Sequence, residues 1–179
     1  MKNIVSLFFI KNIFKKGDLK NMRINFRDNI LEIEEARIIY RNFSGEGSKY
    51  NREGDRNFAV IIPDEESKEI LVNEGWNVKI KPPRDEYEDP FMFLPVKVKF
   101  NNRGPAVYVK SGDVVTRLNE ETVGMLDEID ILNVDLDLRP YDWDVNGKTG
   151  RTAYLQSINV RQNVDRFGAR YAEQDIEIR

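Results

Sequence analysis

Short apolar runs separated by turn residues dominate the sequence from residue 30 onward, and they limit the fold more than any other feature. Residues 30–43 begin with apolar and polar residues in alternation and continue as a β-branched run. Residues 58–62 form a wholly apolar run that ends at Pro63. The first pattern is typical of a half-buried strand and the second of a buried one. The sequence therefore predicts a mainly β protein.

Strand-like patterns continue along the chain, with two short helices between them. Further strands are expected at residues 76–81, 91–100, 106–109, 129–138 and 152–160. We expect Asp64 to cap a helix that stops at Gly75, and Asn119 to cap a second helix that ends near residue 127. A helix before the last two strands is the layout of an OB-type fold, so we expect a five-stranded barrel with an inserted helix–strand unit. A β-sandwich is the alternative fold.

The chain has 179 residues and contains neither cysteine nor histidine. These absences exclude disulfides, thiolate metal sites and a cysteine nucleophile, together with the commonest general base and zinc ligand. Hydrophobic residues make up 40% of the chain and charged residues 33%, which is typical of a folded domain with a polar surface. We expect no catalytic residue, no cofactor and no bound metal, and the lack of cysteine fits a reducing compartment.

Residues 1–21 differ in composition from the rest of the chain. They hold five lysines, and their apolar run at residues 4–10 is too short to span a bilayer. Met22 follows a Lys-Gly-Asp segment that a purine-rich ribosome-binding sequence can encode, so we expect residues 1–21 to be a leader or a misplaced start. An N-terminal helix or strand packed on the domain is the alternative. The predicted domain spans residues 22–165, and residues 166–179 form a polar tail.

Two segments with the composition of long, mobile loops carry cations among aromatic residues. The first spans residues 45–58, is rich in glycine and carries Lys49, Tyr50, Arg52, Arg56 and Phe58. The second spans residues 139–151 and carries Tyr141, Trp143, Lys148 and Arg151, with Asn146-Gly147 as the favoured turn of a β-hairpin. Cations meet phosphates, and aromatic rings stack on bases of any identity. Both segments therefore suit a single-stranded nucleic acid.

The net charge of −3 leaves two other functions open. Phosphate binding depends on a local basic patch rather than on the sum over the chain, so an acidic protein can still bind nucleic acid. One alternative is an interaction protein or inhibitor whose acidic surface binds a host protein. The other is a metal-dependent nuclease, because Asp135 and Asp137 alternate with apolar residues and share one face of a predicted strand.

Several motifs resemble those of phage and prophage single-stranded DNA-binding proteins over roughly residues 30–165. They include Ala36 to Gly45, Phe58 to Ile62, Gly75-Trp76-Asn77-Val78, Lys81-Pro82-Pro83-Arg84, Asn133 to Leu136 and Arg139-Pro140-Tyr141-Asp142-Trp143. The resemblance implies an OB-type fold and the coating of displaced single strands, without catalysis, in phage DNA replication or recombination. It also implies that the protein is located in the cytoplasm of the host bacterial cell. Many such proteins end in an acidic tip, from which this chain departs by ending at Arg179.

We therefore expect the protein to bind single-stranded DNA through stacking rings and phosphate contacts. The expected nucleic-acid-binding residues are Arg41, Lys49, Tyr50, Arg52, Arg56, Lys79, Lys81, Arg84, Tyr141, Trp143, Lys148 and Arg151. A second copy of the chain, as a homodimer, and phage replication or recombination proteins are the further expected partners. No membrane partner is expected.

Overall fold

The structure of the protein, a computed structural model, describes residues 21–164. The predicted tail at residues 166–179 and, apart from Asn21, the predicted leader lie outside the described residues. The described strands are β1 (Arg23–Arg27), β2 (Ile30–Ala36), β3 (Ile38–Asn42), β4 (Arg56–Ile62), β5 (Lys79–Lys81), β6 (Phe91–Val98), β7 (Ala106–Ser111), β8 (Val114–Leu118), β9 (Ile131–Val145) and β10 (Lys148–Gln162). Between them lie the helix α2 (Glu65–Asn73) and the 3-10 helix η1 (Val123–Asp127).

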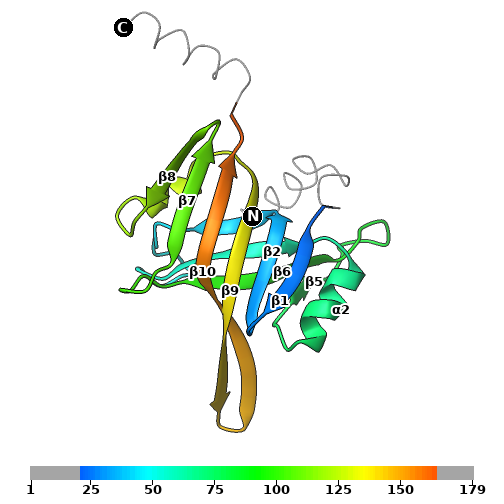
Figure 1. The fold of residues 1–179 in the computed structure, drawn as a ribbon. Helices are drawn as coiled ribbons and strands as arrows, with labels where there is room; N and C mark the ends of the chain where they lie inside the picture. The colour runs from blue at the N-terminus through cyan, green and yellow to red at the C-terminus, as the bar shows by residue number, and fades with distance from the viewer. Residues whose placement is uncertain (1–20, 165–179) are drawn as a thin grey trace, which may run out of the picture.

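All of these strands belong to one mixed sheet, whose main path runs β1-β2-β9-β10-β6-β4-β3. The longest strands, β9 and β10, pair antiparallel, and β10 also pairs in parallel with β6 at one part of its length and with β7 at another. The sheet folds over, so that β4 and β6 cross behind β9 and β10 (Figure 1). β10 is therefore the strand that joins the two parts of the sheet.

The core fills the space that the folded sheet encloses. Apolar side chains from β2, β4, β6, β7, β9 and β10 form one buried cluster, which burial of apolar surface stabilises. Within it the rings of Phe43 and Phe58 stack with their centroids 5.1 Å apart. On β6 the core residues are Met92, Leu94, Val96 and Val98, so the side chains between them face outward.

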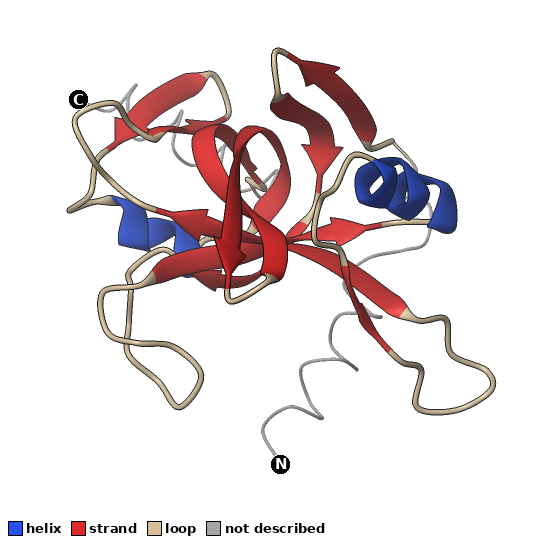
Figure 2. Cartoon of the chain, turned by 90° about the horizontal axis from the view of Figure 1, so that it is seen from below, coloured by secondary structure: helices blue, strands red, loops and turns tan. Residues whose placement is uncertain are grey.

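The two helices occupy opposite sides of the strands (Figure 2). The predicted cap of α2 is confirmed, because the Asp64 side chain accepts a hydrogen bond from the Ser67 backbone N–H at 2.8 Å. The second predicted helix is the shorter η1, which follows an Asn119 side chain bonded to the backbone of Thr122. Within residues 21–164, neither helix is long and apolar enough to cross a membrane.

The predicted β-rich, OB-like class is confirmed, as is the helix–strand unit, α2 and β5, inserted between β4 and β6. The sheet has ten strands instead of the five that we predicted, and the strands form one sheet, whereas a β-sandwich has two.

The prediction of a mobile loop at residues 139–151 was wrong, because these residues belong to the paired strands β9 and β10 and the turn between them. They meet at a two-residue turn, where Asn146 and Gly147 have φ of 53° and 77°. Positive φ at both central residues is the signature of a type I′ hairpin, so the predicted Asn-Gly turn is confirmed.

Candidate nucleic-acid interface

The outer ends of β9 and β10 project from the body as a two-stranded ribbon (Figure 1). The register places Trp143 opposite Gly150, Tyr141 opposite Thr152 and Arg139 opposite Tyr154. Residues directly opposite each other on paired strands point to the same side of the sheet. One side of the ribbon, which we call the ribbon face, therefore carries Arg139, Tyr141, Trp143, Lys148 and Tyr154.

Trp143 lies flat against the backbone of its cross-strand partner. A Cβ atom built on Gly150 would lie only 2.3 Å from Trp143 Cζ2, so the indole ring fills the space that any other residue at position 150 would use. The ring is nevertheless 37% exposed and does not belong to the core cluster. The absence of a side chain at Gly150 thus lets the Trp143 ring pack against the backbone while it stays accessible to a ligand.

The other rings of the ribbon face are arranged around Tyr154. Tyr141 meets Tyr154 edge to face, with centroids 6.0 Å apart and ring planes at 86°, and is itself 54% exposed. The Arg139 guanidinium lies over the Tyr154 ring, 5.0 Å from its centroid. These contacts hold the rings in place, because edge-to-face aromatic pairs and cation–π pairs are both attractive.

The opposite side of the ribbon is anchored to the body through Arg151. Its guanidinium donates to both carboxylate oxygens of Asp142, at 2.6 and 3.0 Å, and to the backbone oxygen of Glu74 at 2.6 Å. It also lies 5.3 Å from the ring centroid of Trp76. The hydrogen bond from Arg151 lowers the pKa of Asp142, and the same bond raises the pKa of Arg151. Arg151 therefore sits on the other side of the ribbon from Trp143.

The ribbon face continues onto the outer face of β6. β10 pairs in parallel with β6 at this point, and Tyr154 lies beside Lys97. Since Val96 and Val98 are buried, Lys97 and Lys99 point outward from the sheet. A row of Arg139, Tyr154 and Lys97 thus crosses β9, β10 and β6 on one surface.

The Gly-rich loop between β3 and β4 is folded, although the sequence predicted a mobile loop. The Asn51 side-chain amide donates to the backbone oxygens of Arg52 and Asp55, at 3.0 and 2.8 Å, and Gly54 N–H donates to Gly45 O at 2.8 Å. Outside this network, Tyr50 is 79% exposed, and the Lys49 ammonium lies 5.6 Å from its ring centroid. Arg52 is also exposed.

Two of the predicted cations have partners inside the protein. Arg56 donates to the backbone oxygen of Phe43 at 2.9 Å and pairs with Glu120 at 3.1 Å. Arg41 donates to the backbone oxygens of Leu126 and Ile129, at 2.6 and 2.7 Å. Burial lowers the pKa of Arg41. Both arginines join the loop and β3 to the segment around η1.

The remaining predicted cations lie around a second aromatic cluster on the outer face of β5 and β6. Lys81 donates to the Tyr40 hydroxyl at 2.9 Å, and the Tyr40 ring meets Phe93 edge to face with centroids 5.6 Å apart. Lys79 lies beside Phe93 in the register of β5 and β6 and is exposed. Arg84 lies exposed in the loop that follows.

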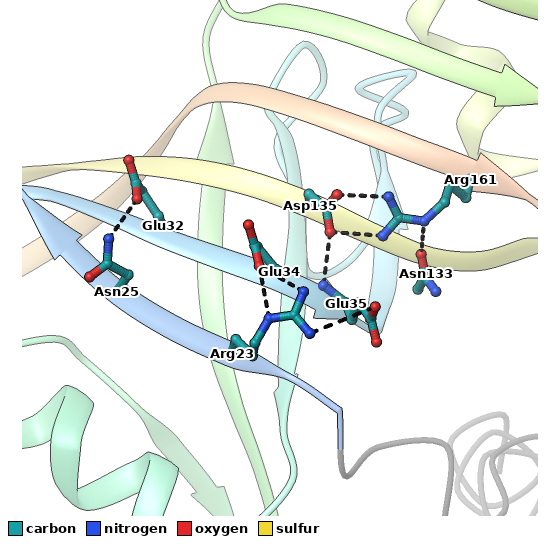
Figure 3. Close-up of polar contacts among 8 residues, drawn as sticks. All are labelled: Arg23, Asn25, Glu32, Glu34, Glu35, Asn133, Asp135 and Arg161. Atoms are coloured by element: carbon teal, nitrogen blue, oxygen red, sulfur yellow. Dashed lines mark hydrogen bonds and ion pairs between the residues drawn. The ribbon is translucent and has the colours of Figure 1, made fainter.

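The body end of the same β9–β10 surface carries a group of carboxylates, several of them paired with arginines (Figure 3). Both oxygens of Asp135 accept from the Arg161 guanidinium, at 2.7 and 2.8 Å, and Oδ1 also accepts from the Glu35 backbone N–H at 2.8 Å. The hydrogen bond from Arg161 lowers the pKa of Asp135. Asp137 accepts from the Ser157 hydroxyl at 2.8 Å. With Glu32 and Glu34 of β2, which pair with Arg27 and Arg23, these two carboxylates form what we call the acidic patch.

Of the twelve predicted site residues, the structure brings Tyr141, Trp143 and Lys148 together on the ribbon face. It leaves Lys49, Tyr50 and Arg52 on the folded loop and Lys79, Lys81 and Arg84 at β5, whereas Arg41, Arg56 and Arg151 bind other parts of the protein. Sequence reasoning missed Lys97, Lys99, Arg139 and Tyr154 as site residues. For the two lysines the signal was their alternation with Val96 and Val98, which placed them on an outer face.

Comparison with known proteins identifies the family of the chain. The family model described as "Putative phage ssDNA-binding domain" matches residues 20–177. Among solved structures, the single-stranded DNA-binding protein from bacteriophage Enc34 in complex with ssDNA is similar at 13% identity, with a TM-score of 0.50, over 83% of this chain and 99% of that one. A second structure of the single-stranded DNA-binding protein from bacteriophage Enc34 is similar at 13% identity, with a TM-score of 0.49, over 83% of this chain and 93% of that one.

The Enc34 likeness at this identity supports the fold. No curated protein matches the chain. The family match covers most of the sequence and includes every strand that the structure describes. The chain therefore belongs to the family of phage single-stranded DNA-binding domains.

Proposed function

We propose that the protein binds single-stranded DNA without sequence preference and acts in phage DNA replication or recombination, in the cytoplasm of the host cell. The observation that carries this proposal is the ribbon face, where three aromatic rings share one surface with a cation at each end. Rings of this kind stack on any base, and each stacked base contributes about 1–3 kcal/mol. The family supports the same function.

The ribbon face suits a single strand better than a duplex. Trp143 and Tyr141 present ring area to a ligand, and bases offer their faces for stacking only when they are unpaired. Lys148 and Arg139 lie at the two ends of the same face and supply charge for the phosphates. Stacking does not depend on the identity of the base, so binding by this face needs no sequence preference.

The predicted site residues divide into two groups in this proposal. Those that contact DNA are Lys49, Tyr50, Arg52, Lys79, Lys81, Arg84, Tyr141, Trp143 and Lys148. Arg41, Arg56 and Arg151 position the binding elements instead, because each already donates to a backbone oxygen of another segment.

We further propose that the protein is not an enzyme. The nuclease alternative relied on Asp135 and Asp137, and their oxygens accept hydrogen bonds from Arg161 and Ser157. A bidentate arginine competes with a metal ion for the same carboxylate lone pairs. This arrangement supports a structural role for the two acids.

The test is a titration of a fluorescently labelled poly-dT oligonucleotide with the full chain, read by anisotropy at low and high salt. We expect binding to weaken as salt is raised. Unlabelled single strands should displace the labelled oligonucleotide more effectively than duplex of the same length. Absence of binding at low salt would contradict the proposal. Magnesium-dependent shortening of the oligonucleotide would instead favour the nuclease.

A further inference from the structure

A cationic hollow lies beside the ribbon face, between the 99–105 turn and β10. Its volume is about 460 Å³, and its lining includes Lys99, Asn101, Arg103, Pro105, Arg139 and Gln156. Three of these side chains are cations, and none is acidic. Among residues 21–164, the ion pairs of the structure involve none of these three cations. The hollow therefore carries positive charge that the described part of the protein leaves unneutralised.

The hollow has a defined backbone. On one side, Asn101 and Gly104 close the turn with two reciprocal hydrogen bonds, at 2.8 and 3.2 Å, and the Asn101 side chain accepts from Arg103 N–H at 2.8 Å. On the other side, the ladder between β9 and β10 shifts between Leu155 and Ser157, which leaves Gln156 as a bulge. Bulges turn side chains and backbone groups out of the regular ladder, and here the bulge forms part of the wall.

The hollow is continuous with the ribbon face through Arg139. This side chain covers the Tyr154 ring and also lines the hollow. In the other direction along β9, the same outer surface leads to Asp137 and then Asp135, in the acidic patch. A single strand that passes Arg139 thus meets carboxylates if it follows β9, and Lys97 and Lys99 if it turns onto β6.

We propose that the hollow binds one backbone phosphate of the single strand, at the point where the strand leaves the ribbon face and turns across β6. The inference rests on the proposed single-stranded DNA binding. A phosphate fits because two guanidinium groups and an ammonium surround a site without a carboxylate, and guanidinium forks match phosphate oxygens. Along β9 the strand would instead meet Asp137 and the pairs Arg161–Asp135, Arg23–Glu34 and Arg27–Glu32, whose cations already have protein partners.

The test compares Lys99→Ala and Arg103→Ala with the control Lys110→Ala in the poly-dT titration. Both pocket residues are exposed, and Lys110 is an exposed lysine of β7 that lies beside Arg161, beyond the acidic patch. We expect each pocket variant to lower affinity at low salt by roughly threefold or more and to reduce the slope of log K against log salt by about 0.7, as for one lost phosphate contact. Lys110→Ala leaves both unchanged, and Arg103→Lys keeps most of the slope.

A crosslinking experiment locates the strand directly. A benzophenone amino acid introduced at Gln156, on the rim of the hollow, is expected to crosslink to poly-dT under illumination, whereas the same probe at Lys110 is not. If wild-type protein binds DNA but both pocket variants keep the wild-type salt slope, the hollow holds no phosphate and the proposed function still stands. If wild-type protein does not bind, both proposals fail.

Discussion

At the scale of single residues, the cross-strand pair of Trp143 and Gly150 decides whether the ribbon offers a stacking surface. The indole ring rests on backbone, and its neighbours on the ribbon face are Tyr141 and Lys148. The hydrophobic core does not include this ring, so the ring is not needed for core packing. A ring held in this way by a glycine is already oriented before DNA arrives, which reduces the entropy lost on binding.

Replacing Trp143 with alanine is expected to weaken single-stranded DNA binding far more than it lowers the melting temperature. Loss of one stacked base costs about 1–3 kcal/mol of binding free energy, or roughly fivefold to more than a hundredfold in Kd. Anisotropy and thermal unfolding of the same preparation measure the two effects. Equal losses of binding and of melting temperature would mean that Trp143 is a core residue.

Replacing Gly150 with alanine is expected to displace the Trp143 ring, because the new methyl group would lie 2.3 Å from Cζ2. Binding to poly-dT weakens, and the indole emission spectrum shifts as the ring moves. Thr149→Ala is the matched control, since Thr149 is the exposed neighbour of Gly150 and lies opposite Asp144 on the other side of the ribbon. A Gly150→Ala variant with wild-type affinity and emission would show that the Trp143 ring does not pack on Gly150.

At the scale of elements, the β9–β10 ribbon is held by one arginine on the side away from its rings. Arg151 joins the ribbon to the residue that follows α2, through Asp142 and the backbone oxygen of Glu74. The ribbon is otherwise a two-stranded hairpin, which is only marginally stable on its own. Its orientation therefore depends on this contact together with the pairing of β10 and β6 at its base.

Arg151→Ala separates a positioning role from direct phosphate binding. If Arg151 only orients the ribbon, affinity for poly-dT falls while the slope of log K against log salt stays at the wild-type value. A direct phosphate contact would instead reduce that slope by about 0.7. The titration is repeated at several salt concentrations for both proteins, with Lys148→Ala as the variant that is expected to change the slope.

The contact between Asp135 and Arg161 makes the union of β2, β9 and β10 sensitive to acid. The pKa of Asp135 is lowered in the folded protein, so its contribution to stability is present above its unfolded pKa of 3.8 and is lost as pH falls through the folded value. We expect the urea midpoint of wild-type protein to drop steeply below about pH 4, and Asp135→Asn to flatten this dependence. The control Asp113→Asn, in the exposed β7–β8 turn, should show the same pH dependence of the urea midpoint as wild type. If Asp135→Asn also showed the wild-type pH dependence, the Asp135–Arg161 contact would not be its cause.

Local patterns predicted most of the elements, but not the surface that they form together. The strand at residues 91–100 and the Asn146-Gly147 turn were both predicted from local patterns. The ribbon was missed because Pro140 and several aspartates have low strand propensity, which the long pairing with β10 overrides. The contact of Lys97 with Tyr154 depends on a parallel register between strands far apart in sequence, which no local pattern specifies.

At the scale of the whole molecule, charge is separated along a single surface. The chain has a net charge of −3, yet the ribbon face, β6 and the hollow carry cations, and the acidic patch begins directly beyond Arg139. The field of such a surface directs a polyanion to one part of it, even when the protein as a whole is acidic.

This separation predicts a moderate salt dependence. If Lys97, Lys99, Arg103, Arg139 and Lys148 each meet one phosphate, these five contacts alone contribute about −3.5 to the slope of log K against log salt for single strands. Titrations of poly-dT over a series of salt concentrations measure it. A slope near zero would mean that phosphate contacts contribute little and that stacking alone binds the strand.

The position of β10 in the sheet determines when the sheet can form during synthesis of the protein. This strand is the last that the structure describes, and its neighbours are β9, β6 and β7. A nascent chain on the ribosome therefore carries β6 and β7 without their common partner until residues 148–162 have emerged. Tyr154 and Gly150 arrive in that same segment, so the newly made polypeptide becomes able to hold a single strand only when its sheet is complete.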